Sequence, residues 1–323
     1  MTPRQAIRDV PASVRQRLLN LAREQRLRFE GVLQRYAVER FLYRLSASDE
    51  ADRFTLKGAA LLRVWAGQEL RPTRDIDFLA RGARDEAAIR TALRDVCGVP
   101  CQEDGVVFDP ATIAITSIRI DQPNGGFRVR IRGGLGRVRL AVPIDIGFGD
   151  VLTLGRRQED YPTLLDLPAP RLWTYPRDTM VAEKFHAMAS LGDANSRVKD
   201  LWDVACLARR FAFDGDALRT AIAEAFRHRG TSLAGGRPTA LRAGYYDEHE
   251  SPARGQRWRE LRRQIASGID GPDRLEDAGE ELRRFLGPIC DSLIEERPFA
   301  QTWPPGGLWR PGVQARTQDH GGE

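Results

Sequence analysis

The sequence predicts an α+β first half followed by a helical second half. Within the first 50 of the 323 residues, apolar side chains recur at helical spacing. Between residues 106 and 147 they alternate instead, which indicates strands, and after residue 176 the helical spacing returns. We therefore expect an α+β domain over residues 1–172, a helical domain over 173–297, and a Pro/Gly-rich tail over 298–323.

Two short strands and a turn organise the middle of the first domain. Residues 53–57 read as a strand, Gly58 begins a helix, and residues 75–79 form a second strand. Every second residue from 138 to 146 is apolar, so Asp145 points away from its apolar neighbours. In the second half, helices are expected at residues 178–191, 196–210 and 216–229, with others around 258–265 and 274–285.

Composition excludes some classes of protein. No apolar run approaches the ~20 residues of a membrane span, and the first residues lack the apolar core of a signal peptide. The four cysteines have no partners at zinc-site spacing, so we expect them to be reduced in a cytoplasmic protein without a membrane partner. The net charge of +5 permits an anionic partner without identifying one.

Lysine is rare in this chain. Of the 50 basic Lys and Arg residues, only Lys57, Lys184 and Lys199 are lysines. An ammonium is a compact point charge and a guanidinium a wide planar fork, so the two differ at a phosphate. All three lysines lie in segments that have other catalytic features, which suggests a phosphate-handling enzyme.

A D-x-D pair follows the Gly58 turn. On a strand, Asp75 and Asp77 share one face and repel each other unless a cation such as Mg²⁺ neutralises them. The turn exposes backbone N–H groups that suit a phosphate. Asp145, from another strand, is the candidate third carboxylate of a two-metal site. The alternative is a solvated strand end without catalytic function.

A second charged group lies on the helix expected to start at residue 196. It consists of Arg197, Lys199, Asp200 and Asp203. Spacings of three residues place most of it on one side of the helix, where a neighbouring helix can present Lys184. A lysine near a triphosphate would offset the charge that grows on departing pyrophosphate. The alternative is a structural cluster of ion pairs that joins two helices.

Two ordered blocks of motifs resemble a known family. Residues 54–62 (FTLKGAALL) and 71–78 (RPTRDIDF) form the first block; residues 175–187 (YPRDTMVAEKFHA) and 195–203 (NSRVKDLWD) form the second. They resemble the AbiEii/AbiGii toxin family, which includes the MenT tRNA nucleotidyltransferase toxins. The resemblance implies a DNA-polymerase-β-like nucleotidyltransferase core with a mixed sheet, followed by a helical C-terminal domain.

The resemblance also implies roles for particular residues. Asp75 and Asp77 would hold Mg²⁺, with Lys184 and Asp200 as further catalytic residues and Asp145 added from its strand position. The nucleotide would be bound by Lys57, Gly58, Ala59, Arg74 and Lys184, with support from Arg197, Lys199 and Asp203. Ala59 stands where many nucleotidyltransferases have serine and this family often has glycine; without a hydroxyl at this position, backbone N–H groups must contact the triphosphate.

The resemblance predicts a toxin that transfers a nucleotide from an NTP to an RNA 3′-hydroxyl. The tRNA acceptor end is the expected acceptor, which would block translation, and an antitoxin protein is the expected partner. Two alternatives remain open: nucleotidylation of a small molecule or a protein hydroxyl, and a non-catalytic NTP-binding regulatory module. For an RNA substrate, the candidate backbone contacts include arginines 128, 130, 132, 137 and 139, which otherwise form a solvated face.

Overall fold

The structure is a computed structural model that describes residues 9–118, 125–150 and 152–312. The chain divides into two compact units between Pro176 and Arg177. The sequence placed this division at residue 172, inside a strand that the structure assigns to the first unit. Each unit is described here by itself.

The first unit combines four helices and seven strands within its described residues. Its helices are α1 (Val10–Glu24), α2 (Phe29–Ser46), α3 (Ala60–Ala66) and α4 (Glu86–Gly98). Its strands are β1 (Phe54–Lys57), β2 (Ile76–Ala80), β3 (Val106–Ile118), β4 (Gly126–Leu135), β5 (Val138–Phe148), β6 (Arg157–Asp160) and β7 (Arg171–Thr174). The strands form one mixed sheet in the order β3-β4-β5-β2-β1-β7-β6, so the predicted mixed sheet is confirmed.

The centre of the sheet has a fixed register. Strands β4 and β5 form a hairpin that begins at the pair Leu135–Val138, and Gly136 between them has φ +57°, which glycine adopts without steric cost. Strand β2 then pairs with β5 in parallel and with β1 antiparallel. As a result, β2 lies between β5, the second strand of the hairpin, and β1, the strand that leads into α3.

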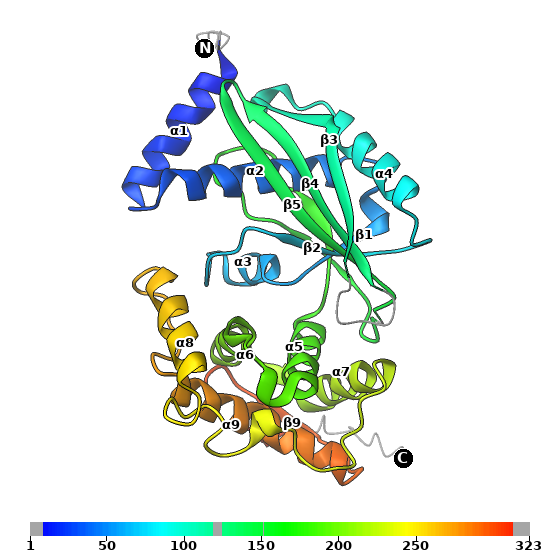
Figure 1. The fold of residues 1–323 in the computed structure, drawn as a ribbon, viewed down its shortest axis with the longest axis vertical. Coiled ribbons are helices and arrows are strands. Elements are labelled where there is room, and N and C mark those ends of the chain that lie inside the picture. Colours follow the sequence, from blue (N-terminus) through cyan, green and yellow to red (C-terminus); the bar gives the residue numbers. More distant parts are fainter. Residues whose placement is uncertain (1–8, 119–124, 151, 313–323) are drawn as a thin grey trace, which may run out of the picture. The chain divides into compact units, whose positions relative to one another are not determined.

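Helices cover one face of β3–β5. Figure 1 shows α2 crossing behind these strands and α4 beside β3. The edge of the Phe108 ring packs on Phe41 of α2, with ring centroids 5.7 Å apart. Beside this contact Arg44 donates two hydrogen bonds to the buried carboxylate of Asp104, at 2.7 and 3.1 Å. The opposite face of β3–β5 faces the viewer, and no helix formed by the described residues of this unit covers it (Figure 1).

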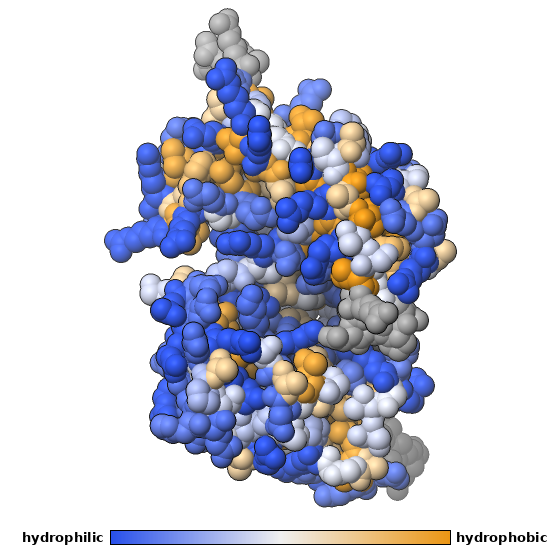
Figure 2. All heavy atoms as spheres, viewed as in Figure 1, coloured by the Kyte–Doolittle hydropathy of each residue, from blue (hydrophilic) through white to orange (hydrophobic). Residues whose placement is uncertain are grey.

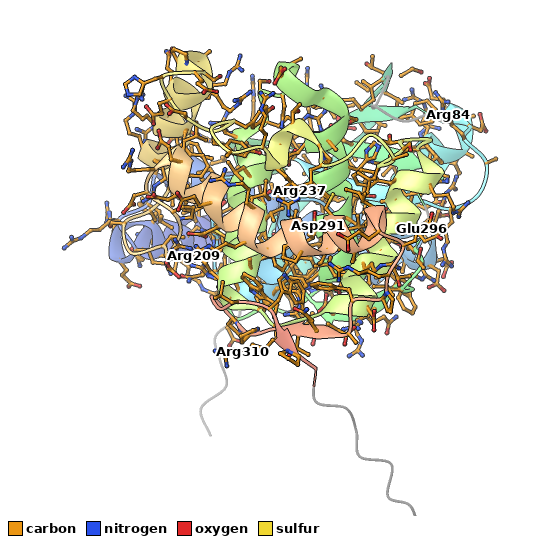
Figure 3. The ribbon with its side chains drawn as sticks, turned by 90° about the horizontal axis from the view of Figure 1, so that it is seen from below. Arg84, Arg209, Arg237, Asp291, Glu296 and Arg310 are labelled. Carbon is orange, nitrogen blue, oxygen red and sulfur yellow. The ribbon has the colours of Figure 1, made fainter. Side chains whose placement is uncertain are left out.

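The second unit contains mostly helices and a small sheet in its described residues. The helices are α5 (Arg177–Leu191), α6 (Val198–Arg210), α7 (Gly215–His228), α8 (Pro252–Gln264) and α9 (Leu275–Ile294). The strands are β8 (Phe213–Asp214), β9 (Gln301–Trp303) and β10 (Arg310–Pro311), in the order β10-β9-β8. Figure 3 labels Arg237 and Asp291, whose side chains meet at 2.6 Å and fix α9 to the segment between α7 and α8.

Three strands of the structure fall where the sequence indicated a link or a tail. The segment around Pro162–Pro176 read as a proline-spaced link, yet β7 within it pairs in parallel with β1. The tail expected from residue 298 contributes β9 and β10, because the Trp303 ring packs against Phe285 and its indole N–H bonds Ala208. Residues 313–323 lie outside the described part. In that part, no helix combines the length and apolar character of a membrane span.

Candidate active site

The turn between β1 and α3 brings the backbone of Gly58 against the side chain of Asp77. Gly58 has φ +69°, a conformation that side-chain-bearing residues rarely adopt. A Cβ built on Gly58 would lie only 2.1 Å from Oδ2 of Asp77. Position 58 therefore needs glycine for two reasons, its backbone conformation and the space that the carboxylate occupies.

Three aspartates lie on the same face of the sheet. Asp77 is opposite Asp145 in the parallel β2–β5 pair, where neighbouring strands are about 4.8 Å apart. Asp75 precedes β2 by one residue and so has the same parity as Asp77. Asp75 is exposed, whereas Asp77 and Asp145 are half-buried. The predicted neighbourhood of Asp145 and the D-x-D pair is thus what the strand register gives.

Arg128 binds Asp145 from the neighbouring strand β4. Its Nε and Nη2 donate to the two carboxylate oxygens at 2.9 and 2.7 Å, although 61% of the Arg128 side chain is exposed. Hydrogen bonding to Asp145 raises the pKa of Arg128, and the charges of Asp75 and Asp77 add to this effect. The guanidinium therefore neutralises part of the negative charge that the three carboxylates share.

Lys57 binds a carboxylate that the sequence did not single out. Its Nζ lies 2.6 Å from Oδ2 of Asp150, and the hydroxyl of Tyr175 donates to the same oxygen at 3.0 Å. Lys57 is opposite Asp77 in the β1–β2 register, so the pair lies beside the D-x-D strand. The structure thus shows Lys57 bound to a carboxylate, and its role at the nucleotide stays a prediction.

A pocket opens beside Asp75. It lies between α2, α3 and the segment before β2, and its charged and small lining residues include Arg35, Ala59, Arg63, Glu69, Arg71, Arg74 and Asp75. Arg63 and Arg71 are buried, and burial raises the pKa of the Glu69 carboxyl despite the neighbouring arginines. The cationic groups of this lining outnumber the carboxylates, so the pocket suits an anion.

Of the three aspartates, Asp75 and Asp77 fit a divalent cation. Mg²⁺ is usually bound through one or two protein carboxylates together with substrate phosphates, and Asp75 and Asp77 supply such a pair of hard oxygen donors. Among the described residues, no group of three His, Cys, Asp or Glu side chains forms a ready-made metal site. Both oxygens of Asp145 are bound by Arg128 in this structure.

The second unit contains its own charged cluster. Nζ of Lys184 on α5 lies 2.6 Å from Asp200 and 2.7 Å from Asp203, both on α6. The Asp203 side chain is completely buried, whereas Lys184 and Asp200 are 12% and 15% exposed. The structure thus brings Lys184, Asp200 and Asp203 together, and a tie between two helices accounts for Asp203. A role for Lys184 at the nucleotide stays a prediction.

The other two residues expected to give support, Arg197 and Lys199, lie at the start of α6. Arg197 is the residue before the helix, and its backbone N–H bonds the side chain of Asn195 at 2.9 Å. Lys199 is exposed in the first turn. The helix begins at Val198 rather than at residue 196 as expected, because this Asn195 contact holds the preceding backbone outside the helix.

A family model decides the identity of the chain. The model describes the nucleotidyl transferase AbiEii toxin of type IV toxin–antitoxin systems, and it matches residues 40–286. The chain belongs to the AbiEii toxin family. The predicted family is therefore confirmed: the protein is a nucleotidyltransferase toxin by family, and that family implies an antitoxin partner.

Two solved structures from Helicobacter pylori resemble this AbiEii-family chain. One, described as a nucleotidyltransferase, is 15% identical, covers 88% of this chain and 99% of its own, and gives a TM-score of 0.43. The other, JHP933, is 14% identical, covers 87% and 95%, and gives a TM-score of 0.44. No curated protein matches the chain. The family assignment rests on the family model.

Sequence reasoning missed several charged residues of the AbiEii-family site. Asp150 was not considered; it lies two residues after the end of β5. Arg128 was considered as an RNA-backbone contact or a solvated arginine, and not as the partner of Asp145. The partner of Arg128 could have been found from the two-residue turn Gly136–Arg137. Counting the same number of residues away from this turn along each strand pairs Arg128 with Asp145.

Proposed function

We propose that the protein transfers a nucleotide from an NTP to an RNA 3′-hydroxyl, and that the acceptor is the 3′ end of tRNA. The observation that carries the proposal is the Asp77 carboxylate held against the Gly58 turn, beside Asp145 and next to an arginine-lined pocket. Carboxylates beside a cationic pocket are what transfer from a triphosphate requires. The RNA acceptor is what the motif resemblance implies.

In the first unit, different residues would bind the triphosphate and the metal ion. Arg71 and Arg74, with Arg35 and Arg63 behind them, would hold the triphosphate in the pocket. Asp75 and Asp77 would hold Mg²⁺, which when bound supplies positive charge to the phosphates. The fixed position of Asp77 against Gly58 keeps this carboxylate oriented before the substrate arrives.

The chemical step is a substitution at the α-phosphorus. The RNA 3′-oxygen forms a bond to this phosphorus, the bond to the bridging oxygen breaks, and pyrophosphate leaves. The hydroxyl proton passes to a carboxylate, for which Asp145 is the candidate. In this structure both oxygens of Asp145 accept hydrogen bonds from Arg128, and proton transfer to this carboxylate would weaken them.

A labelling experiment tests this proposal. Purified protein is incubated with Mg²⁺, total tRNA and each of the four α-labelled NTPs in turn, and label in the tRNA band is measured. We expect transfer with at least one NTP, and a loss of at least about 100-fold in Asp77→Asn because a positioned charge is removed. Asp95→Asn, an exposed carboxylate on α4, is the matched control and should keep full activity.

Three results would count against the proposal. Label that appears in small molecules or protein but never in RNA would change the acceptor class. NTP-dependent thermal stabilisation without pyrophosphate release would indicate a binding module. Equal transfer by wild type and Asp77→Asn would remove the D-x-D pair from the mechanism.

A further inference from the structure

The open face of β4 and β5 carries a row of arginines that leads to the carboxylates. We call Arg128, Arg130, Arg132 and Arg139 the arginine face; all four side chains are exposed. The first three alternate along β4 with the buried residues Phe127, Val129 and Ile131. Arg139 lies on β5, opposite Gly134 of β4. It therefore extends the row beyond Arg132 on the same face.

We propose that the arginine face binds the phosphate backbone of the acceptor RNA and directs its 3′ end to the carboxylates. The inference rests on the proposed function and adds to it where the acceptor strand lies. Arg128 connects the two regions because it is both the first arginine of the row and the partner of Asp145. From there the row runs along β4 away from β2, within one continuous sheet.

The spacing of the row matches a regular polyanion. Alternate residues on a strand are about 6.6 Å apart, which is comparable with the distance between successive phosphates of an extended nucleic acid strand. A guanidinium presents a planar fork of donors that binds phosphate oxygens in pairs. Arginines at this interval can therefore contact consecutive phosphates without reading the base sequence.

Charge on the face is strongly one-sided. Among the described residues, Arg128 forms a salt bridge with Asp145, whereas Arg130, Arg132 and Arg139 form none. Asp109 is the acidic residue opposite Arg132 on β3. The remaining cross-strand neighbours of Arg128, Arg130 and Arg132 are uncharged and small, and are Ala114, Thr116, Ala141 and Pro143.

The same composition argues against a protein partner. Protein interfaces need a central cluster of large apolar or aromatic side chains, and such anchors carry most of the binding energy. Val107, 73% exposed on β3, is the one strongly exposed large hydrophobic residue in the described part of the first unit. Figure 2 shows hydrophilic side chains among hydrophobic ones over this part of the molecule. A row of exposed arginines fits nucleic acid better than it fits a protein partner.

RNA binding by a triple variant tests the inference without requiring catalysis. Arg130, Arg132 and Arg139 are replaced by Gln, and Arg128 is kept because it contacts Asp145. Binding of a short fluorescein-labelled single-stranded RNA is measured by anisotropy in EDTA without NTP, over a range of salt concentrations. The matched control replaces Arg17, Arg23 and Arg94, which are exposed on α1 and α4, and removes the same charge.

The expected result is a change in both affinity and salt dependence. The plot of log affinity against log salt should become shallower by about 2, from about 0.7 per lost phosphate contact on a single strand. Affinity at physiological salt should fall about tenfold or more in the triple variant and stay within about twofold in the control. Urea midpoints should match wild type in both, because the replaced side chains are exposed.

Other outcomes would overturn the inference. Equal losses in the two triple variants would show a dependence on net charge alone. Unchanged RNA binding in the Arg130/Arg132/Arg139 variant would place the RNA elsewhere, and displacement of RNA by polyglutamate at equal charge would indicate an acidic protein partner. RNA binding through this face without nucleotide transfer would refute the proposed function and leave standing only the RNA-binding role of the arginine face. Transfer to RNA with no effect of the triple variant would do the reverse.

Discussion

Replacement of Gly58 by alanine should disable the site by moving one carboxylate. Alanine at φ +69° costs about 1–2 kcal/mol relative to an ordinary backbone conformation. The added Cβ would also meet Asp77 at 2.1 Å from Oδ2 and 2.7 Å from Cγ, far inside van der Waals contact. The side chain must therefore leave its position, and a strained χ angle adds about 0.5–1.5 kcal/mol.

Gly67 provides a matched control for the backbone term. It lies at the other end of α3 with φ +67°, and a Cβ there meets no atom within 4 Å. Gly67→Ala should therefore cost only the about 1–2 kcal/mol of the left-handed conformation and leave Asp77 in place. The difference between the two variants isolates the contact with the carboxylate.

Two assays separate stability from function. Urea denaturation should show a lower midpoint for both variants, with Gly58→Ala the lower of the two. Transfer of labelled nucleotide should fall about 100-fold in Gly58→Ala, because a shift of about 1 Å in a positioned group is enough for such a loss. Gly67→Ala should keep wild-type transfer. If the two variants behave alike in both assays, Asp77 is not held by the Gly58 turn as argued.

Three further predictions concern charged groups. Lys184→Met removes the charge beside the buried Asp203 and should destabilise the protein by about 3–5 kcal/mol in urea denaturation, whereas adding Asp203→Leu should restore most of the loss. Arg128→Gln frees both oxygens of Asp145, so Mn²⁺ affinity measured by EPR titration should rise severalfold while stability changes by less than about 1 kcal/mol; unchanged affinity would contradict this. Burial lowers the pKa of His186 to about 4 from 6.5, so the unfolded chain gains a proton between these values that the folded chain does not. Stability should therefore fall by about 3 kcal/mol more in wild type than in His186→Gln as pH drops from 6.5 to 4, and parallel pH curves would refute this.

The sequence predicted most of the site because periodicity fixes faces. Alternation of apolar residues around Asp77 and Asp145 puts both carboxylates on the polar side of their strands. That the two strands are neighbours is a matter of topology, and periodicity does not state it. The prediction assumed this step, because a two-metal site would need a third carboxylate from a neighbouring strand.

Long-range pairs between charged residues were beyond the sequence pattern. Arg44 has the position of an ordinary helical arginine on α2, yet it is buried against Asp104 from a distant loop. Lys57 and Asp150 meet in the same way across the sheet. Each pair depends on where two separate segments come together, which local spacing does not encode. The end of α9 was missed for a similar reason. This helix continues through Pro288 to Ile294 because it is packed within the second unit.

Arg128 connects the carboxylates with the arginine face because its guanidinium has two possible partners, Asp145 and an RNA phosphate. In this structure it neutralises Asp145 and lies in the field of Asp75 and Asp77. A phosphate of RNA on the arginine face would compete for the same guanidinium, since its oxygens accept from arginine in the same bidentate way. Asp145 would then lose its hydrogen bonds at the moment an acceptor strand arrives, and a released carboxylate is what proton transfer from the 3′-hydroxyl needs. The pair is exposed enough for such an exchange to cost only about 1 kcal/mol. Arrival of the acceptor would thus expose the proton acceptor.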